Sequence, residues 1–184
     1  MTENAHSLIF RQQENTNSQI GKYIRMAFIH VQIETQATPE NCWTLLKDYQ
    51  NIDFFNPYVA RSFLLDEHTP NGIGALRQCN FKDGKNYIKE RIIDWQEGKS
   101  FTVDIYEGTM PVNDIKTSLG IKPRAMGGAQ LYMHMEYTPK WGFFGAILNR
   151  LMMTSQFEKM ARNVLLGLDQ KATLANTTPQ RDVT

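Results

Sequence analysis

The sequence predicts an α+β fold in which a curved antiparallel sheet of about seven strands wraps around one long C-terminal helix. Residues 27–34 alternate between apolar and polar side chains, as a strand with one solvated face does. A succession of further strand-like runs with short turns fills residues 58–137. From Tyr137 to about Leu174 the apolar residues instead recur at helical spacing.

Length and composition favour one domain with a substantial core. The chain has 184 residues, of which 41% are hydrophobic and 11% aromatic, and this length is enough for one core but short for two. Lys and Arg number 20 against 19 Asp and Glu, so the formal net charge is +1. Such a balance offers no electrostatic case for nucleic acid or an anionic membrane. We therefore expect no nucleic-acid partner.

Both ends of the chain have the polar composition of tails. Residues 1–25 are rich in Asn, Gln, Thr and Ser, and are either a native extension or the product of an upstream start before Met26. No run approaches the roughly 20 apolar residues of a membrane span, and the N-terminus lacks a secretory apolar region. We expect a polar extension over 1–25, a domain over 26–175, a polar tail over 176–184 and no integral membrane segment.

Two short helices are predicted after the first strand. Thr38 can cap a helix and Pro39 suits its first position, and the apolar residues then keep helical spacing as far as Tyr49. A second, broken helix is expected through 51–55. It ends at Asn56, because a proline at the next position pushes the preceding residue out of the helical region.

Strands and turns alternate in the middle of the chain, and the short links between them imply antiparallel neighbours. The dipeptide Asp83-Gly84 is the strongest hairpin signal in the sequence. The strands expected here are 58–66, 75–82, 85–95, 101–106, 112–121 and 131–137.

The register of that hairpin predicts a buried charge pair. A two-residue loop pairs Lys82 with Lys85 and places Arg77 opposite Glu90. The lysine-rich face is the solvated one, so Arg77 and Glu90 share the inward face with apolar neighbours. Burying two charges is costly unless they are paired. The pair is therefore either a register lock at the rim of the sheet or a polar anchor for the head group of a ligand.

The C-terminal helix is predicted to begin at Thr138-Pro139 and to be the longest element. Two glycines in its first turns, Gly142 and Gly145, make this beginning either a gate with aromatic edges or a tight packing point. The apolar stripe then changes face between the first half of the helix and the second. Either the helix kinks or breaks near 153–156, or its second half packs on another surface, such as the N-terminal segment or another subunit.

No motif for metal binding or nucleophilic catalysis is evident. The histidines have no partner at ligand spacing, and Gly-x-Ser-x-Gly is absent. Gly72-Ile73-Gly74 opens a strand and therefore cannot act as a phosphate cradle at a helix. The two cysteines, Cys42 and Cys79, lie far apart and favour neither a disulfide framework nor a zinc site, so we expect a cytoplasmic protein with no metal and no cofactor.

Methionines gather in the last strand and the terminal helix. They either fill the core or form an adaptable wall for a flexible apolar ligand, because methionine repacks easily. The residues concerned are Met126, Met133, Met135, Met152, Met153 and Met160.

Several segments, in this order, resemble a known family: residues 38–48, Phe55-Asn56-Pro57, Gly72 and Gly74 with Arg77, Asp83-Gly84, Glu90-Arg91 and residues 137–142. The chain resembles the START-like SRPBCC superfamily, specifically its polyketide cyclase/dehydrase-type branch, over roughly residues 27–172. The resemblance implies a helix-grip (START-like, Bet v 1-like) fold around a hydrophobic pocket. Members of the superfamily include aromatase/cyclases, quinone-binding proteins and lipid carriers. Phe55 and Met133 stand where tryptophan is common, which should make this pocket softer.

Two function hypotheses follow. In the first, the protein binds a hydrophobic or amphipathic small molecule, such as a lipid, quinone or polyketide-like compound, as a carrier or chaperone. In the second, it is a cyclase or dehydratase that uses Glu90 as acid or base. We prefer the first, because no His paired with Tyr or Asp in a catalytic arrangement can be identified. The candidate ligand-binding residues are Phe55, Arg77, Phe81, Glu90, Ile92, Val103, Met133, Phe144, Leu148 and Leu151.

Overall fold

A computed structural model describes residues 26–139 and 146–177, with the side chains of the last helix described over 152–175. These residues form one seven-stranded sheet in the order β1-β7-β6-β5-β4-β3-β2, with all neighbours antiparallel. The predicted α+β class is confirmed. The elements are β1 (Ala27–Thr35), α2 (Pro39–Lys47), the 3-10 helix η1 (Tyr49–Phe54), β2 (Val59–Leu64), β3 (Leu76–Phe81), β4 (Tyr87–Gln96), β5 (Ser100–Gly108), β6 (Val112–Pro123), β7 (Ala129–Pro139) and α3 (Ala146–Thr177).

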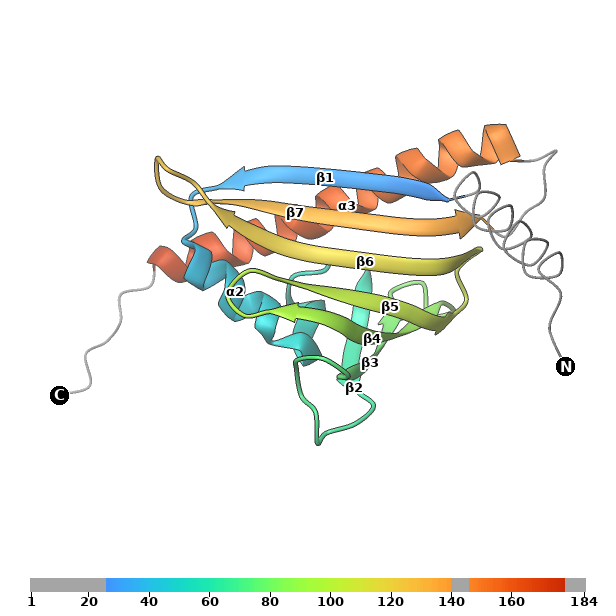
Figure 1. Cartoon of the computed structure of the whole chain (residues 1–184), viewed down its shortest axis with the longest axis horizontal. Helices are drawn as coiled ribbons and strands as arrows, with labels where there is room; N and C mark the ends of the chain where they lie inside the picture. The colour runs from blue at the N-terminus through green and yellow to red at the C-terminus, as the bar shows by residue number, and fades with distance from the viewer. Residues whose placement is uncertain (1–25, 140–145, 178–184) are drawn as a thin grey trace, which may run out of the picture.

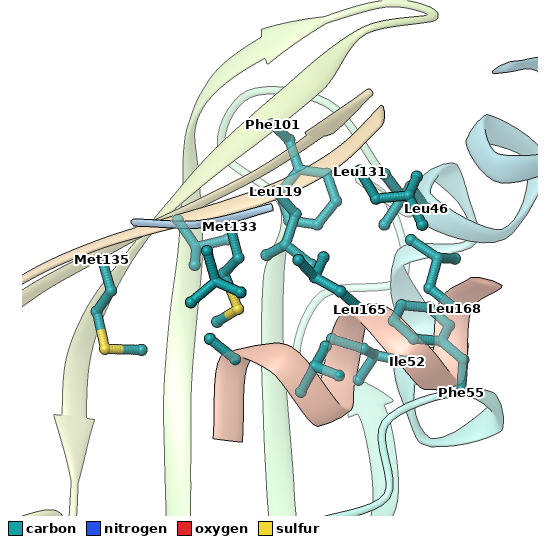
Figure 2. Packing of buried hydrophobic residues seen from close by; sticks show 14 of the residues in the cluster. Leu46, Ile52, Phe55, Phe101, Leu119, Leu131, Met133, Met135, Leu165 and Leu168 are labelled. Atoms are coloured by element: carbon teal, nitrogen blue, oxygen red, sulfur yellow. The ribbon is translucent and has the colours of Figure 1, made fainter. Parts of the chain in front are cut away.

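The sheet curves around α3, which runs behind β1 and β7 in Figure 1, with α2 beside its C-terminal half. Alternate residues of β7 are buried along almost its whole length, because successive side chains of a strand point to opposite faces. The inward side chains meet those of α3 and η1 in one core. Figure 2 shows Leu119 and Met133 of the sheet directed toward Leu165 of α3.

Local signals account for the two short helices. The Thr38 side chain accepts a hydrogen bond of 3.2 Å from the backbone nitrogen of Asn41, and Pro39 occupies the first turn, as predicted. The second helix, η1, is interrupted by non-helical backbone at Asn51, as expected for a broken helix. Helix α2 packs against α3 and β6, and η1 packs against β2 and β3.

The predicted beginning of the terminal helix is wrong. Thr138 and Pro139 belong to β7, where they pair with Asn113 and Val112 of β6. Hydrogen bonding along the sheet therefore overrides the local capping signal of Thr-Pro, which acts over only a few residues. Residues 140–145, which contain both glycines of the predicted gate, lie outside the described residues.

Helix α3 has 32 residues and runs without interruption, so the predicted break near 153–156 is absent. Its second half packs into the main core of the domain, against β1, β7 and α2. Among the described residues, no helix combines the length and the apolar character needed to cross a membrane. The buried side chains follow helical spacing and are Ala161, Val164, Leu165, Leu168 and Ala172.

One glycine sets how closely α3 approaches the loop after η1. A Cβ atom built on Gly167 would lie 2.0 Å from the carbonyl oxygen of Phe55. Two side-chain hydrogen bonds hold the helix in this position. Asn163 Nδ2 donates to the Tyr58 hydroxyl at 2.7 Å, and Thr35 Oγ1 donates to Asp169 Oδ1 at 2.5 Å. The helix is therefore positioned by backbone contact as well as by apolar packing.

We expect Gly167→Ala to destabilise the protein by about 1–3 kcal/mol, because the clash with a backbone oxygen outweighs the better helix propensity of alanine. Urea unfolding followed by circular dichroism measures this change. Ser155→Ala on the exposed side of α3 is the matched control and should leave stability equal or slightly higher. A Gly167→Ala variant as stable as this control would contradict the close approach.

Candidate functional site

A cavity of about 70 Å³ lies between the concave face of the sheet and α3. Its walls come from every strand except β1, from η1 and the loop after it, and from α3, so the whole helix-grip arrangement contributes. Apolar side chains predominate. The lining residues are Ile52, Asn56, Tyr58, Val59, Arg77, Cys79, Phe81, Ile88, Glu90, Val103, Ile105, Met110, Thr117, Leu119, Met133, Met135, Met160 and Val164.

An ion pair lies in this apolar wall. The side chains of Arg77 and Glu90 are only 2% and 5% exposed. Arg77 donates from Nε at 2.9 Å and from Nη2 at 2.6 Å, both to Glu90 Oε1. The guanidinium also lies 3.8 Å from the centre of the Tyr49 ring, and its Nη1 donates to the Tyr49 carbonyl oxygen. The charge is thus matched by an anion, an aromatic face and a backbone acceptor.

The register of β3 and β4 places both charges on the inward face, as predicted. Arg77 is opposite Glu90, Cys79 is opposite Ile88, and the backbone nitrogen of Phe81 donates to the Asn86 oxygen at 2.9 Å. Strand β3 ends at Phe81 and β4 begins at Tyr87, so the strands stop before the expected Lys82–Lys85 pair. The hairpin prediction is therefore confirmed for the positions that reach the cavity.

Burial by itself would lower the pKa of the Arg77 guanidinium, but the adjacent Glu90 carboxylate outweighs it and raises this pKa above its usual value. Burial is also the main reason why the pKa of the Tyr49 hydroxyl is raised, and Glu90 adds to it. Arg77 is therefore charged and the Tyr49 hydroxyl neutral at neutral pH.

Two polar atoms of cavity-lining side chains receive no hydrogen bond from the described residues. Glu90 Oε1 receives Arg77 and also the Cys79 thiol at 3.2 Å, whereas no donor to Oε2 is found among the described residues. Thr117 is 4% exposed, and its Oγ1 is buried without a hydrogen-bond partner in the described structure. Buried polar atoms are usually satisfied, so the buried Thr117 Oγ1 in the wall of a cavity that also holds the open Glu90 Oε2 favours a bound molecule.

Sequence reasoning missed Thr117 and Tyr49. Thr117 has the same strand parity as Ile115, Leu119 and Ile121, which are all buried. A polar residue at an inward position of an apolar strand is a signal that the sequence does contain. The role of Tyr49 has no such signal, because its ring and carbonyl meet Arg77 only through tertiary packing.

The structure brings together half of the predicted ligand-binding residues. Phe55 and Ile92 are buried in the core but do not line the cavity. Phe144 lies outside the described residues, and Leu148 and Leu151 belong to α3 but their side chains are not described. The residues that do line the cavity are Arg77, Phe81, Glu90, Val103 and Met133.

Methionines form much of the cavity wall, and their predicted role as an adaptable wall for a ligand stays a prediction. Met133, Met135 and Met160 face the cavity together with Met110, while Met126 is 94% exposed and takes no part. The cavity is smaller than the roughly 300–1,000 Å³ of typical ligand pockets. A ligand of ordinary size therefore requires the walls to move, and flexible methionine side chains permit this at little cost.

The described cysteines are protonated thiols, and the described residues hold no metal-binding cluster. Burial raises the pKa of Cys79 to about 12, although Arg77 opposes the shift, and burial with Asp169 raises the pKa of Cys42 to about 11. Both thiols are therefore protonated at neutral pH. Among the described residues no group of three or more His, Cys, Asp or Glu side chains is arranged to hold a metal ion.

Comparison with known proteins agrees with this fold. The family profile described as "Polyketide cyclase / dehydrase and lipid transport" matches residues 26–173. No curated protein gave a significant match.

Solved structures of three bacterial proteins share the fold at low identity. Protein XoxI from Bacillus cereus has a TM-score of 0.63 at 19% identity and covers 83% of this chain and 99% of its own. An uncharacterized protein from Bacillus thuringiensis has a TM-score of 0.61 at 18% identity, covering 80% and 99% of the two chains. A protein from Nitrosospira multiformis has a TM-score of 0.60 at 14% identity, covering 83% and 100%.

We expect Arg77→Met to destabilise the protein by about 3–5 kcal/mol, because it leaves the Glu90 carboxylate buried without its cation. The double variant Arg77→Met, Glu90→Leu should recover most of this loss, since it replaces both charges with apolar groups. Urea unfolding of the two variants and the wild type tests the expectation. A double variant no more stable than Arg77→Met would show that the pair itself is net stabilising.

We expect both cysteines to resist alkylation by iodoacetamide in the folded protein at pH 8. With a pKa of about 12, only about one Cys79 thiol in ten thousand is ionised at that pH. Mass spectrometry should show labelling of Cys42 and Cys79 only after unfolding in urea. Rapid labelling of Cys79 in the native protein, with Cys42 protected as an internal control, would contradict the buried thiol.

Proposed function

The chain belongs to the polyketide cyclase/dehydrase and lipid transport family, and from this premise we propose that it binds a hydrophobic or amphipathic small molecule as a carrier or chaperone. The ligand occupies the cavity between the sheet and α3. The observation that carries this proposal is the buried Arg77–Glu90 pair in a wall that is otherwise mostly apolar.

The energetics of the pair support a role beyond folding. Two buried charges cost desolvation free energy that their attraction only partly returns, and apolar residues of similar volume are often equally stable. The alternative is that the ion pair only fixes the pairing register of β3 and β4, and that role requires no cavity beside the charges. Here the pair borders the cavity directly. The described hydrogen bonds to Glu90 all end on Oε1, and Thr117 Oγ1 in the same wall is buried without a described partner.

The proposal assigns ligand contacts to five of the predicted residues and to the methionine wall. Arg77 and Glu90 orient the polar part of the ligand, and Phe81, Val103 and Met133 contact its apolar part. Contacts from Phe144, Leu148 and Leu151 stay predictions. The binding domain extends over residues 26–175, with the polar segments 1–25 and 176–184 outside it.

A cyclase or dehydratase activity is the second candidate, and one contact favours it. The Cys79 thiol lies within hydrogen-bond reach of Glu90, so a second titratable group is present beside the pair. Its raised pKa makes it a donor that holds the carboxylate and not a partner that exchanges protons with substrate. Glu90 would then act alone, which is why binding is the preferred function.

Native mass spectrometry of the purified protein tests the proposal. We expect a co-purified small molecule whose mass adds to that of the chain. Val103→Phe should abolish its retention, because the larger side chain fills the cavity. Val31→Phe is the matched control, since Val31 is a buried strand residue outside the cavity wall, and it should leave retention intact.

Two outcomes would count against binding at this site. Retention of the same molecule by Val103→Phe would place the ligand elsewhere. A bare wild-type chain that also fails to take up added apolar compounds would reject the binding function. Turnover of a supplied polyketide chain that disappears in Glu90→Gln would instead favour the enzyme.

A further inference from the structure

The polar atoms of the cavity also identify the chemical class of its ligand. Resting on the proposed function, we propose that the ligand is uncharged and carries a hydroxyl group that donates a hydrogen bond to Glu90. A ligand with a free carboxylate, such as a fatty acid, is the class that the site rejects. Three features of the wall lead to this inference.

The first feature is the charge balance. Among the described lining residues, Arg77 is the only cation and Glu90 the only anion. Each nitrogen of the Arg77 guanidinium already donates one hydrogen bond, from Nε and Nη2 to Glu90 and from Nη1 to the Tyr49 carbonyl oxygen, and its charge is balanced by Glu90. A carboxylate ligand would therefore lie beside Glu90 with no cation left to neutralise it. Like charges in a desolvated site repel strongly, so an anionic head group is disfavoured.

The second feature is the kind of atom left open. A carboxylate oxygen is an acceptor only, so Glu90 Oε2 can be satisfied only by a donor. A hydroxyl group supplies that donor without adding charge. An ester, ether or ketone cannot, because its oxygen is itself an acceptor. The geometry at Glu90 thus distinguishes alcohols and phenols both from acids and from neutral compounds that lack a donor.

The third feature is Thr117, which offers a second polar contact at a distance. Thr117 on β6 pairs with Val103 on β5, and Val103 pairs in turn with Ile92 on β4. Ile92 is two residues from Glu90 on the same strand. Two strand spacings separate the two elements, about 10 Å across the sheet. Thr117 Oγ1 can donate or accept, so it can bind a second neutral oxygen of the ligand. Apolar side chains of β5 line the surface between the two contacts.

The test compares three molecules of equal chain length by isothermal titration calorimetry at pH 7.5. Decanol has a donor and no charge, decanoate has a charge, and methyl decanoate has neither donor nor charge. We expect wild-type protein to bind decanol about tenfold more tightly than decanoate, with methyl decanoate also weaker than decanol, because each loses the hydrogen bond to a charged acceptor.

Glu90→Gln then tests the cause of the preference. It removes the anion and leaves Arg77 unmatched, so decanoate should gain affinity and the order of decanol and decanoate should reverse. Glu107→Gln is the matched control, because Glu107 pairs with Lys89 at 2.8 Å on the exposed face. That variant should bind the three molecules as the wild type does. If Glu90→Gln does not fold, the wild-type comparison still decides.

The possible results separate the class of ligand from the binding function itself. Equal or tighter binding of decanoate by the wild type would overturn the ligand class while leaving the binding function in place. Methyl decanoate binding as tightly as decanol would overturn the requirement for a donor. Absence of binding by all three, together with a bare chain in native mass spectrometry, would reject the proposed function and this inference with it.

Discussion

The buried contact between Arg77 and Glu90 is the interaction on which the arrangement around the cavity depends. It joins β3 to β4, and through the Tyr49 carbonyl and ring it also joins the sheet to η1. A guanidinium can serve three partners at once because its five N–H groups and its flat face point in different directions. The contact between η1 and the sheet therefore includes a buried polar group beside the cavity, in addition to apolar packing.

The contacts that α3 makes with the rest of the domain differ in how easily they can change. Gly167 brings the backbone of α3 against the Phe55 carbonyl, which leaves little freedom at that point (Figure 2 shows Phe55 beside Leu168). Met133, Met135 and Met160 form a softer wall farther along the helix. A rigid polar end and a deformable methionine end suit a site that recognises one functional group and tolerates variation in the rest of a molecule.

Much of the fold and part of the site could be predicted because the relevant signals are local. Alternation identified the strands, and the Asp83-Gly84 turn set the register that places Arg77 opposite Glu90. The end of β7 was mispredicted because Thr138 and Pro139 carry a genuine capping signal that pairing with β6 overrides. Phe55 was assigned to the ligand by resemblance, but it is buried outside the cavity wall, and its carbonyl oxygen faces Gly167 of α3.

The sequence by itself determined the α+β class, the antiparallel order of the central strands and the inward position of the charge pair, because strand parity and turn chemistry act between neighbours in the chain. Tertiary structure alone decided the rest: that Tyr49 lies under Arg77, that Thr117 has no described partner, and that the cavity measures about 70 Å³. Such features depend on how side chains distant in sequence fill a common volume, and no periodicity in the chain encodes that volume.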